Sequence, residues 1–287
     1  MEIAAFAKRP RTFPPAGYFV GSAVFHYLGP AFAVLLFALV EPLGVAWLRI
    51  LSAAAVFALW RRPWRTLAAL GPEARRLLLA MGTVLALMNA CFYLAIERLP
   101  LGTVAAIEFL PVILLAALGA RSPRNGLALA LAVGGVYLVT DVRLAAEPAG
   151  LVFAFANAGL FALYVVLAHR VARSAVGGGI DGLAGAMLVA AVVATPLGGW
   201  DALPALVDPL ALAAGVGVGV TSSVVPYVCD QLAMARLARA TYALLVSLLP
   251  ATATVVGVVV LAQVPSPVEV AGVALVVGAV AVHREPV

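Results

Sequence analysis

Ten apolar stretches, each about as long as a helix that crosses a bilayer, fill the 287-residue chain almost from end to end. A helix of about 20 apolar residues satisfies its own backbone hydrogen bonds and matches about 30 Å of hydrocarbon. The sequence therefore predicts an all-α polytopic membrane protein with ten transmembrane helices, whose function depends on the few polar residues in those helices. The stretches are Gly17–Val40, Pro42–Trp60, Leu77–Ile96, Leu101–Leu118, Gly126–Thr140, Ala149–Ala168, Ile180–Gly198, Leu210–Cys229, Thr241–Leu261 and Pro267–Val282.

Composition narrows the classes of function. The chain is 64% hydrophobic and only 11% charged, whereas about 25% of the residues in a soluble domain are charged. The short connections between the stretches leave no room for a catalytic domain or a nucleic-acid-binding module. No phosphate-binding loop, Ser-His-Asp order or metal-ligand cluster occurs in the sequence. We therefore predict no catalytic residues, no metal, no cofactor and no nucleic-acid partner, and the lipid bilayer as the surroundings of the chain.

The positive charges predict the orientation in the membrane. If the N-terminus is cytoplasmic and every stretch reverses direction, only Arg98 and Arg143 fall outside, and Arg49 stays within a stretch. Cytoplasmic loops carry an excess of Lys and Arg. Both termini are therefore predicted inside, with residues 1–16 as a cytoplasmic tail. The cytoplasmic set is Lys8, Arg9, Arg11, Arg61, Arg62, Arg65, Arg75, Arg76, Arg121, Arg124, Arg170, Arg173, Arg236, Arg239 and Arg284.

A short internal repeat relates the two halves of the chain. Residues 94–99 (LAIERL) align with residues 232–237 (LAMARL), and each copy is followed by a proline within the next stretch, Pro111 or Pro250. The period is five stretches, an odd number, so the halves must cross the membrane in opposite senses. The sequence predicts two inverted five-helix repeats, over residues 17–142 and 149–283. Secondary transporters often have this plan, with the binding site near the bilayer midplane.

Two charged residues, Arg49 and Glu108, lie well inside the stretches. Burying either in hydrocarbon costs on the order of 3 kcal/mol, which favours a position facing the protein interior or a wet cavity. Arg49, Glu108 and Asn89 each lie seven residues from the predicted outer end of their stretch. At 1.5 Å per residue this depth is about 10 Å. The three side chains are therefore expected to form one polar layer.

The Arg49–Glu108 layer has two interpretations. In the structural one, the two residues form an ion pair that joins two helices and touches no cargo. In the functional one, Glu108 takes up a proton or a substrate amine, while Arg49 tunes that carboxylate or binds a substrate carboxylate. Intramembrane ionisable residues are candidate transport sites.

Other polar and aromatic residues extend the candidate pathway. A structural explanation is open for the serines, which can bond back to helix carbonyls, and for His26, since a lone histidine is often structural. Three prolines, Pro111, Pro226 and Pro250, are candidate hinges because each removes a helix hydrogen bond. The further pathway candidates are His26, Tyr27, Tyr93, Asn157, Tyr164, Ser223, Tyr227 and Ser247.

These motifs resemble the drug/metabolite transporter superfamily, in its EamA-type branch. The most specific parts are Ala46-Trp47-Leu48-Arg49, the segment from Asn89 to Pro111, and Ser223-Val224-Val225-Pro226-Tyr227. Within the branch, Pro100-Leu101-Gly102 followed by Glu108-Phe109 is most similar to the threonine/homoserine exporter group. The chain departs from the pattern in that Leu249 precedes Pro250 where relatives often carry an acid.

The resemblance implies that stretches one to four and six to nine surround a central cavity. Stretches five and ten would then lie at the periphery, as a homodimer contact. It also implies export of amino acids or similar small metabolites, coupled to protons, across a bacterial inner (plasma) membrane. The leading hypothesis is an exporter of small neutral amino acids by alternating access.

Two other hypotheses remain open at this point. A broad-specificity exporter of drugs or aromatic metabolites would suit a cavity rich in tyrosines. A membrane enzyme acting on lipid, or a non-transporting partner subunit, would be of a different class. A lipid enzyme would need catalytic acids or histidines clustered at one membrane face, and the three histidines are dispersed along the chain.

Overall fold

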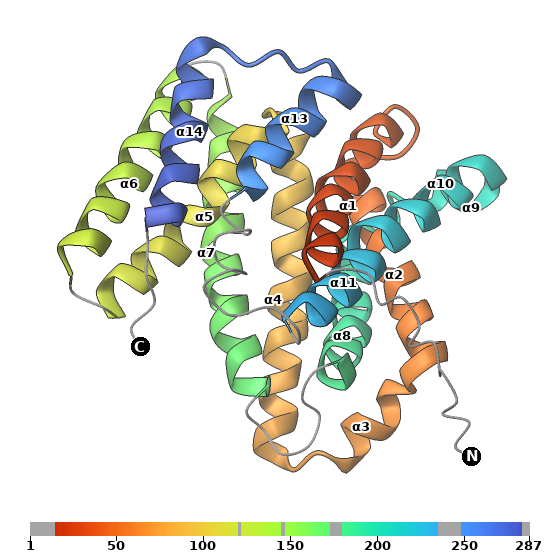
Figure 1. Cartoon of the computed structure of the whole chain (residues 1–287). Helices are drawn as coiled ribbons and strands as arrows, with labels where there is room; N and C mark the ends of the chain where they lie inside the picture. The colour runs from red at the N-terminus through yellow and green to blue at the C-terminus, as the bar shows by residue number, and fades with distance from the viewer. Residues whose placement is uncertain (1–14, 120–121, 145–146, 173–179, 235–247, 283–287) are drawn as a thin grey trace, which may run out of the picture.

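Every regular element is helical over residues 15–119, 122–144, 147–172, 180–234 and 248–282, which are the residues that the computed structural model describes (Figure 1). The elements are α1 (Pro15–Leu36), α2 (Pro42–Arg61), α3 (Pro63–Ala69), α4 (Pro72–Ile96), α5 (Leu101–Gly119), α6 (Pro123–Leu144), α7 (Pro148–Ala172), α8 (Ile180–Gly198), α9 (Leu203–Val207), α10 (Pro209–Gly219), the π-helix η1 (Val220–Val224), α11 (Val225–Met234), α13 (Leu249–Leu261) and α14 (Pro267–Val282).

Each of the ten predicted stretches contains apolar helix. Five helical segments of the described residues are long and apolar enough to cross a membrane: Pro42–Arg61, Pro72–Ile96, Pro148–Ala168, Ile180–Gly198 and Pro209–Cys229. Five further apolar helices are shorter: Val20–Leu36, Leu101–Pro111, Pro123–Val139, Leu249–Leu261 and Pro267–Val282. The prediction of an all-helical fold built from apolar segments is confirmed.

Some predicted boundaries differ from the structure. α4 begins at Pro72 instead of Leu77, because a helix continues through the charged residues Arg75 and Arg76, where hydropathy falls. α1 ends at Leu36, and the chain to Val40 forms turns. The short helices α3 and α9 were not predicted. Hydropathy follows the apolar core of a helix and not its hydrogen-bonded ends.

Proline sets the starting point of many of these helices, among them α2, α4, α10 and α14. Proline suits the first helical position, since its fixed φ matches the helix and its missing N–H would have no partner there. At α14, Ser266 and Glu269 add a capping box: Ser266 N–H donates to Glu269 Oε2 (2.9 Å), and Glu269 N–H donates to Ser266 Oγ (3.3 Å). This cap accounts for a carboxylate that is only 3% exposed.

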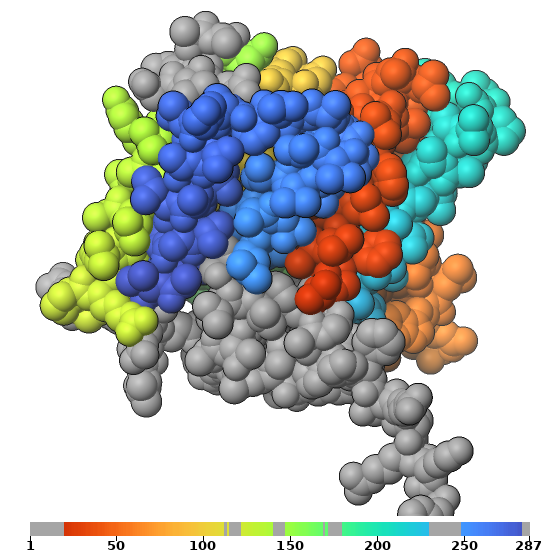
Figure 2. Space-filling view, turned by 45° about the horizontal axis from the view of Figure 1, so that its top comes forward, coloured from red at the N-terminus to blue at the C-terminus, as the bar shows by residue number. Residues whose placement is uncertain are grey.

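The helices pack so that segments from the two halves of the chain alternate. α6 and α14 form a pair at one side of the molecule (Figure 1), and α14, α13 and α1 lie side by side on the face shown in Figure 2. Gly135 and Gly272 let α6 and α14 approach closely, since a Cβ on either would meet the carbonyl oxygen of the other. The remaining main neighbours are α4–α7, α2–α8, α4–α8, α1–α11, α5–α13, α5–α7, α5–α6, α1–α13 and α2–α10.

The predicted eighth stretch is a continuous but irregular helix made of α10, η1 and α11. In η1 the Val225 N–H donates to the carbonyl oxygen of Val220, five residues earlier, and Pro226 follows at once. Gly215 and Gly219 of α10 pack directly against α2, at Leu48 and at Ser52, whereas a Cβ on Gly217 would meet nothing within 4 Å. A π-turn inside a helix is rare and often lies at a functional site.

Candidate functional site

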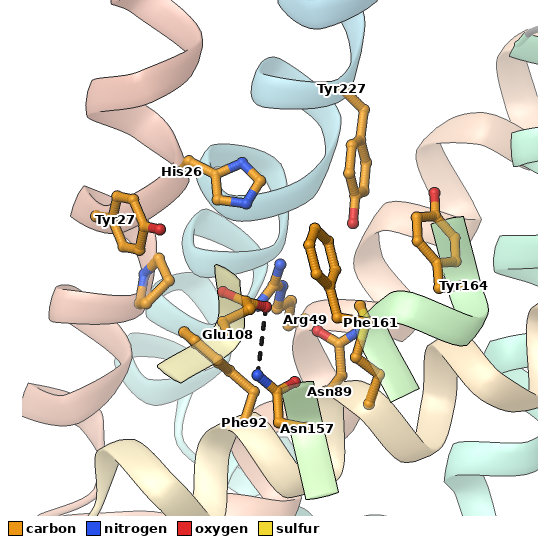
Figure 3. Close-up of a pocket in the computed structure, with 12 residues that line it drawn as sticks. His26, Tyr27, Arg49, Asn89, Phe92, Glu108, Asn157, Phe161, Tyr164 and Tyr227 are labelled. Atoms are coloured by element: carbon orange, nitrogen blue, oxygen red, sulfur yellow. Dashed lines mark hydrogen bonds between the residues drawn. The ribbon is translucent and has the colours of Figure 1, made fainter. Parts of the chain in front are cut away.

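A cavity of about 60 Å³ lies among α1, α2, α4, α5, α7 and α11 (Figure 3). It has room for a few water molecules, well below the roughly 300–1,000 Å³ of typical small-molecule pockets. A small molecule of ordinary size would therefore fit only in a wider form of this cavity. The lining residues are His26, Tyr27, Pro30, Arg49, Met88, Asn89, Phe92, Glu108, Asn157, Phe161, Tyr164 and Tyr227.

Arg49 is buried in α2, with only 6% of its surface exposed, and is held by the π-helix. Its Nε donates to Ser223 Oγ (3.0 Å), and its Nη2 donates to the backbone oxygen of Ser222 (3.1 Å). The guanidinium carbon also lies 5.6 Å from the centre of the Tyr93 ring, within cation–π range. Nη1 donates to no described residue, so this corner of the cavity retains unused positive donors.

The Ser222 carbonyl is available to Arg49 because of the residue four positions later. In an α-helix that carbonyl would accept the N–H of residue 226, but Pro226 has no N–H to give. Arg49 takes the place of the missing donor. A second carbonyl near the break, that of Pro226, accepts from Ser22 Oγ of α1 (3.3 Å). The irregular helix is thus tied to both α2 and α1.

Glu108 lies on the α5 wall of the same cavity. Its Oε1 accepts from Asn157 Nδ2 of α7 at 3.3 Å, the dashed line in Figure 3. Asn157 is fully buried, and its Oδ1 has no hydrogen-bond partner. This single long hydrogen bond is the polar contact that the structure gives Glu108 within its described residues.

Arg49 and Glu108 line one cavity together with Asn89, as the depth argument placed them, but they do not form an ion pair. The ion pairs between described residues are Arg61–Asp181 (2.7 Å) and Arg98–Glu97 (3.0 Å). The structural interpretation of the layer as an Arg49–Glu108 pair is therefore wrong. The pair does not form because the Arg49 side chain is turned toward η1, where two uncharged oxygens accept its hydrogen bonds.

Aromatic rings close the α1 and α11 side of the cavity. The His26 ring lies edge-on to Tyr27 (5.6 Å between ring centres) and to Tyr227 (6.4 Å). Tyr164 of α7 lines the opposite side (Figure 3). Asn89 donates its side-chain amide to the Leu85 oxygen of its own helix (2.8 Å), so its position is fixed locally.

The remaining candidates lie elsewhere. Tyr93 and Ser223 contact Arg49 and do not line the cavity. Pro111 lies inside α5, whereas Pro226 and Pro250 are the second residues of α11 and α13. Ser247 lies outside the described residues.

Five contributors to the site lie outside the set of pathway and hinge residues selected from the sequence. Ser222 offers a backbone oxygen, which no side-chain pattern reveals. The others, Pro30, Met88, Phe92 and Phe161, line the cavity. Helix spacing would have found three of them, because each lies on the same helix face as a predicted residue: Phe161 follows Asn157 by four residues, Phe92 follows Asn89 by three, and Pro30 follows Tyr27 by three. Within the described residues, no three His, Cys, Asp or Glu side chains lie close enough to share a metal ion.

Two relatives identify the family. The chain is 30% identical over 266 residues to the threonine/homoserine exporter RhtA of Salmonella typhimurium strain SL1344, covering 90% of this chain and 88% of the relative. The chain belongs to this exporter family, in the EamA-type branch of the drug/metabolite transporter superfamily. The exporter RhtA of Escherichia coli strain K12 is 29% identical over 255 residues, covering 88% and 84% of the two chains.

Membership of this exporter family places the chain among multi-pass membrane transporters and not among enzymes. The lipid-enzyme hypothesis is therefore overturned. A solved crystal structure has the same fold, with a TM-score of 0.60 and 21% identity over 93% of this chain and 97% of that chain. No protein-family model matches the chain.

Proposed function

We propose that the chain is a secondary active exporter of small neutral amino acids, such as threonine and homoserine, in a bacterial inner membrane. It would work by proton-coupled alternating access. The observation that carries the proposal is a cavity inside an apolar helix bundle with a cation and a carboxylate on separate walls, Arg49 and Glu108. The names of the relatives point to the same cargo.

The proposal includes ten spans in two inverted repeats, residues 17–142 and 149–283, with both termini and the tail of residues 1–16 cytoplasmic. The helix contacts support it. In an inverted repeat, each span has a counterpart five spans along the chain, and a contact in one half should recur between the counterparts. The contact α4–α7 recurs as α11–α1, α5–α7 as α13–α1, α4–α8 as α10–α2, and α5–α6 as α13–α14. The contacts α2–α8, α5–α13 and α6–α14 map onto themselves. A two-fold axis in the membrane plane produces this pattern.

The two charged walls suit an amino-acid zwitterion. Arg49 retains Nη1 for a carboxylate, and Glu108 is the acidic residue among the described lining residues. In this mechanism Glu108 binds a proton or the cargo ammonium as the cavity alternates between the two sides. Arg49 and Asn89 share the polar layer with Glu108, and His26, Tyr27, Tyr164 and Tyr227 line the pathway. Tyr93 and Ser223 support it through Arg49, and Ser247 is the proposed pathway residue that lies outside the described residues.

Alternating access also needs helices that bend. Pro111, Pro226 and Pro250 serve as hinges in the proposal, and the π-turn before Pro226 is the feature that most favours one of them. Because the cavity holds only a few waters, bending must widen it before an amino acid fits.

Counterflow of labelled threonine or homoserine in proteoliposomes tests the proposal. We expect uptake by the parent that responds to a pH gradient, and uptake by Glu108→Gln that does not. Glu97→Gln is the matched control, since Glu97 pairs with Arg98 away from the cavity. Gradient-responsive transport by Glu108→Gln would exclude the proton role. Protection against toxic cations without amino-acid counterflow would instead favour the broad-specificity exporter, for which the aromatic lining is the supporting observation.

We also propose a homodimer through α6 and α14. These helices form a pair at the edge of the molecule, where Tyr137 of α6 is 64% exposed (Figure 1). With Cys91 and Cys229 replaced by alanine, Tyr137→Cys should cross-link two copies in membranes, and its failure to do so at any reagent length would contradict this interface.

A further inference from the structure

In Asn157, one of the two polar atoms of the side-chain amide has a hydrogen bond and the other has none. Asn157 is 0% exposed, its Nδ2 donates to Glu108 Oε1, and its Oδ1 has no partner. Most buried side-chain polar atoms have at least one hydrogen bond, so an exception requires an explanation. The explanation that fits this position is that Asn157 has a second hydrogen-bonding state.

Turning the Asn157 amide over needs little extra space and breaks few hydrogen bonds. Rotation about its last side-chain bond exchanges Nδ2 and Oδ1, which differ in chemistry and hardly in shape. Because Oδ1 makes no hydrogen bond where it now lies, the rotation breaks only the 3.3 Å bond to Glu108. The rotated amide presents Oδ1 beside Oε1 of Glu108.

Two acceptors side by side are complementary to a donor-rich cation. An ammonium group has three N–H donors and no acceptor. Aromatic faces nearby add cation–π attraction, and Phe161 and Tyr164 line the cavity from the same helix as Asn157. Arg49, on the α2 side, offers Nη1 to a carboxylate. A zwitterion would thus be held with its ammonium toward α5 and α7 and its carboxylate toward α2.

We propose that Asn157 determines specificity for the α-ammonium group of the cargo: it donates to Glu108 as in this structure and, with its amide turned over, accepts from an ammonium group bound beside Glu108. The inference rests on the proposed function, because it assumes an amino-acid cargo. It predicts selection of α-amino acids over α-hydroxy acids of the same shape.

Counterflow of labelled homoserine tests this, with unlabelled homoserine and its α-hydroxy analogue 2,4-dihydroxybutyrate as competitors. The parent should bind homoserine at least about ten-fold better than the analogue, since hydrogen bonds to charged groups are the stronger ones. Asn157→Leu, which can neither donate nor accept, should lose most of this ratio. Asn157→Asp, which retains acceptors, should keep it.

If Asn157 had only a structural role, Asn157→Leu would weaken the binding of both competitors equally and leave the ratio of their affinities unchanged. That result would overturn the inference. Asn125→Leu is the matched control, since Asn125 is also buried, at 2% exposed, but does not line the cavity, and its ratio should equal that of the parent. If Asn157→Leu does not fold, the ratio for Asn157→Asp still decides: a fall to about one contradicts the proposal. A parent that transports no homoserine would contradict the proposed function instead.

Discussion

The two charged walls of the cavity are built differently. Arg49 has two hydrogen bonds to the π-helix, at 3.0 and 3.1 Å, and the face of Tyr93 against its guanidinium. Glu108 has one hydrogen bond, at 3.3 Å, to an amide that is itself incompletely bonded. The cation is thus fixed by three groups from other helices, and the carboxylate by one.

This difference suggests a division of labour. Arg49 replaces a backbone donor that Pro226 lacks, so it belongs to the structure of the broken helix as much as to the cavity. Glu108 belongs to the cavity alone, and little is lost when its partner changes. A group that must bind and release protons or cargo should be the weakly held one. Mutations can test whether stability depends on Arg49 and chemistry on Glu108.

The largest expected effect is that of Arg49→Leu. It removes two charge-assisted hydrogen bonds and leaves the Ser222 oxygen buried without a donor, so we expect a loss of about 3–5 kcal/mol in the free energy of unfolding. Denaturant unfolding in detergent micelles measures it. Arg49→Lys, which keeps the charge but not the two-pronged geometry, should recover part of the loss. Unfolding of Arg49→Leu at the midpoint of the parent would remove the structural role from Arg49.

Pushing the broken helix away from α2 should have the next largest effect. A Cβ on Gly219 would clash with Ser52 Oγ and lie 2.7 Å from the carbonyl oxygen of Arg49. Gly219→Ala should therefore cost about 1–3 kcal/mol, as overpacking does. Gly217→Ala is the control in the same helix: it meets nothing within 4 Å and should stabilise by up to about 1 kcal/mol through helix propensity. Equal effects of the two alanines would show that this contact does not hold α10 in place.

More of the fold than of the site could be predicted from the sequence. Hydropathy located ten apolar segments, because a membrane helix needs a long apolar run whatever its neighbours are. It misplaced the start of α4 and missed α3, since helix hydrogen bonding continues past the apolar run. Pro226 signalled a break in the eighth stretch, but the π-turn before it depends on contacts with α1 and α2.

For the site, the sequence predicted how deep each polar side chain lies along its helix, but not the direction in which that side chain points. Counting from the predicted outer ends brought Arg49, Glu108 and Asn89 to one level, and all three line the cavity. Which way Arg49 turns depends on how α2 packs on η1, more than 170 residues away along the chain. No local pattern in the sequence encodes this contact, so the sequence left the Arg49–Glu108 ion pair open as one of two interpretations, and the structure shows no such pair.

A smaller effect separates the two serines of η1. Ser223→Ala removes the oxygen that accepts from Arg49 Nε, and we expect a loss of roughly 1.5 kcal/mol in the free energy of unfolding. Ser222→Ala keeps the backbone oxygen that accepts from Nη2 and removes a hydroxyl with no partner, so it should be neutral or slightly stabilising. The same denaturant titration measures both. A Ser222 variant less stable than the Ser223 variant would mean that the hydroxyl of Ser222, and not its carbonyl, supports Arg49.

Glu108→Gln should also have only a small effect on stability, although it is the variant expected to uncouple transport from the pH gradient. Glutamine keeps a carbonyl oxygen for Asn157 Nδ2 and removes a charge that is expensive to hold inside a membrane. The free energy of unfolding should therefore change by less than about 1 kcal/mol, which is the usual net contribution of one neutral hydrogen bond. Glu108→Leu should be less stable than Glu108→Gln, since it leaves the buried amide of Asn157 with no hydrogen bond at all. If Glu108→Gln instead unfolds as easily as Arg49→Leu, Glu108 also stabilises the structure, and the proposed division between a structural Arg49 and a functional Glu108 is wrong.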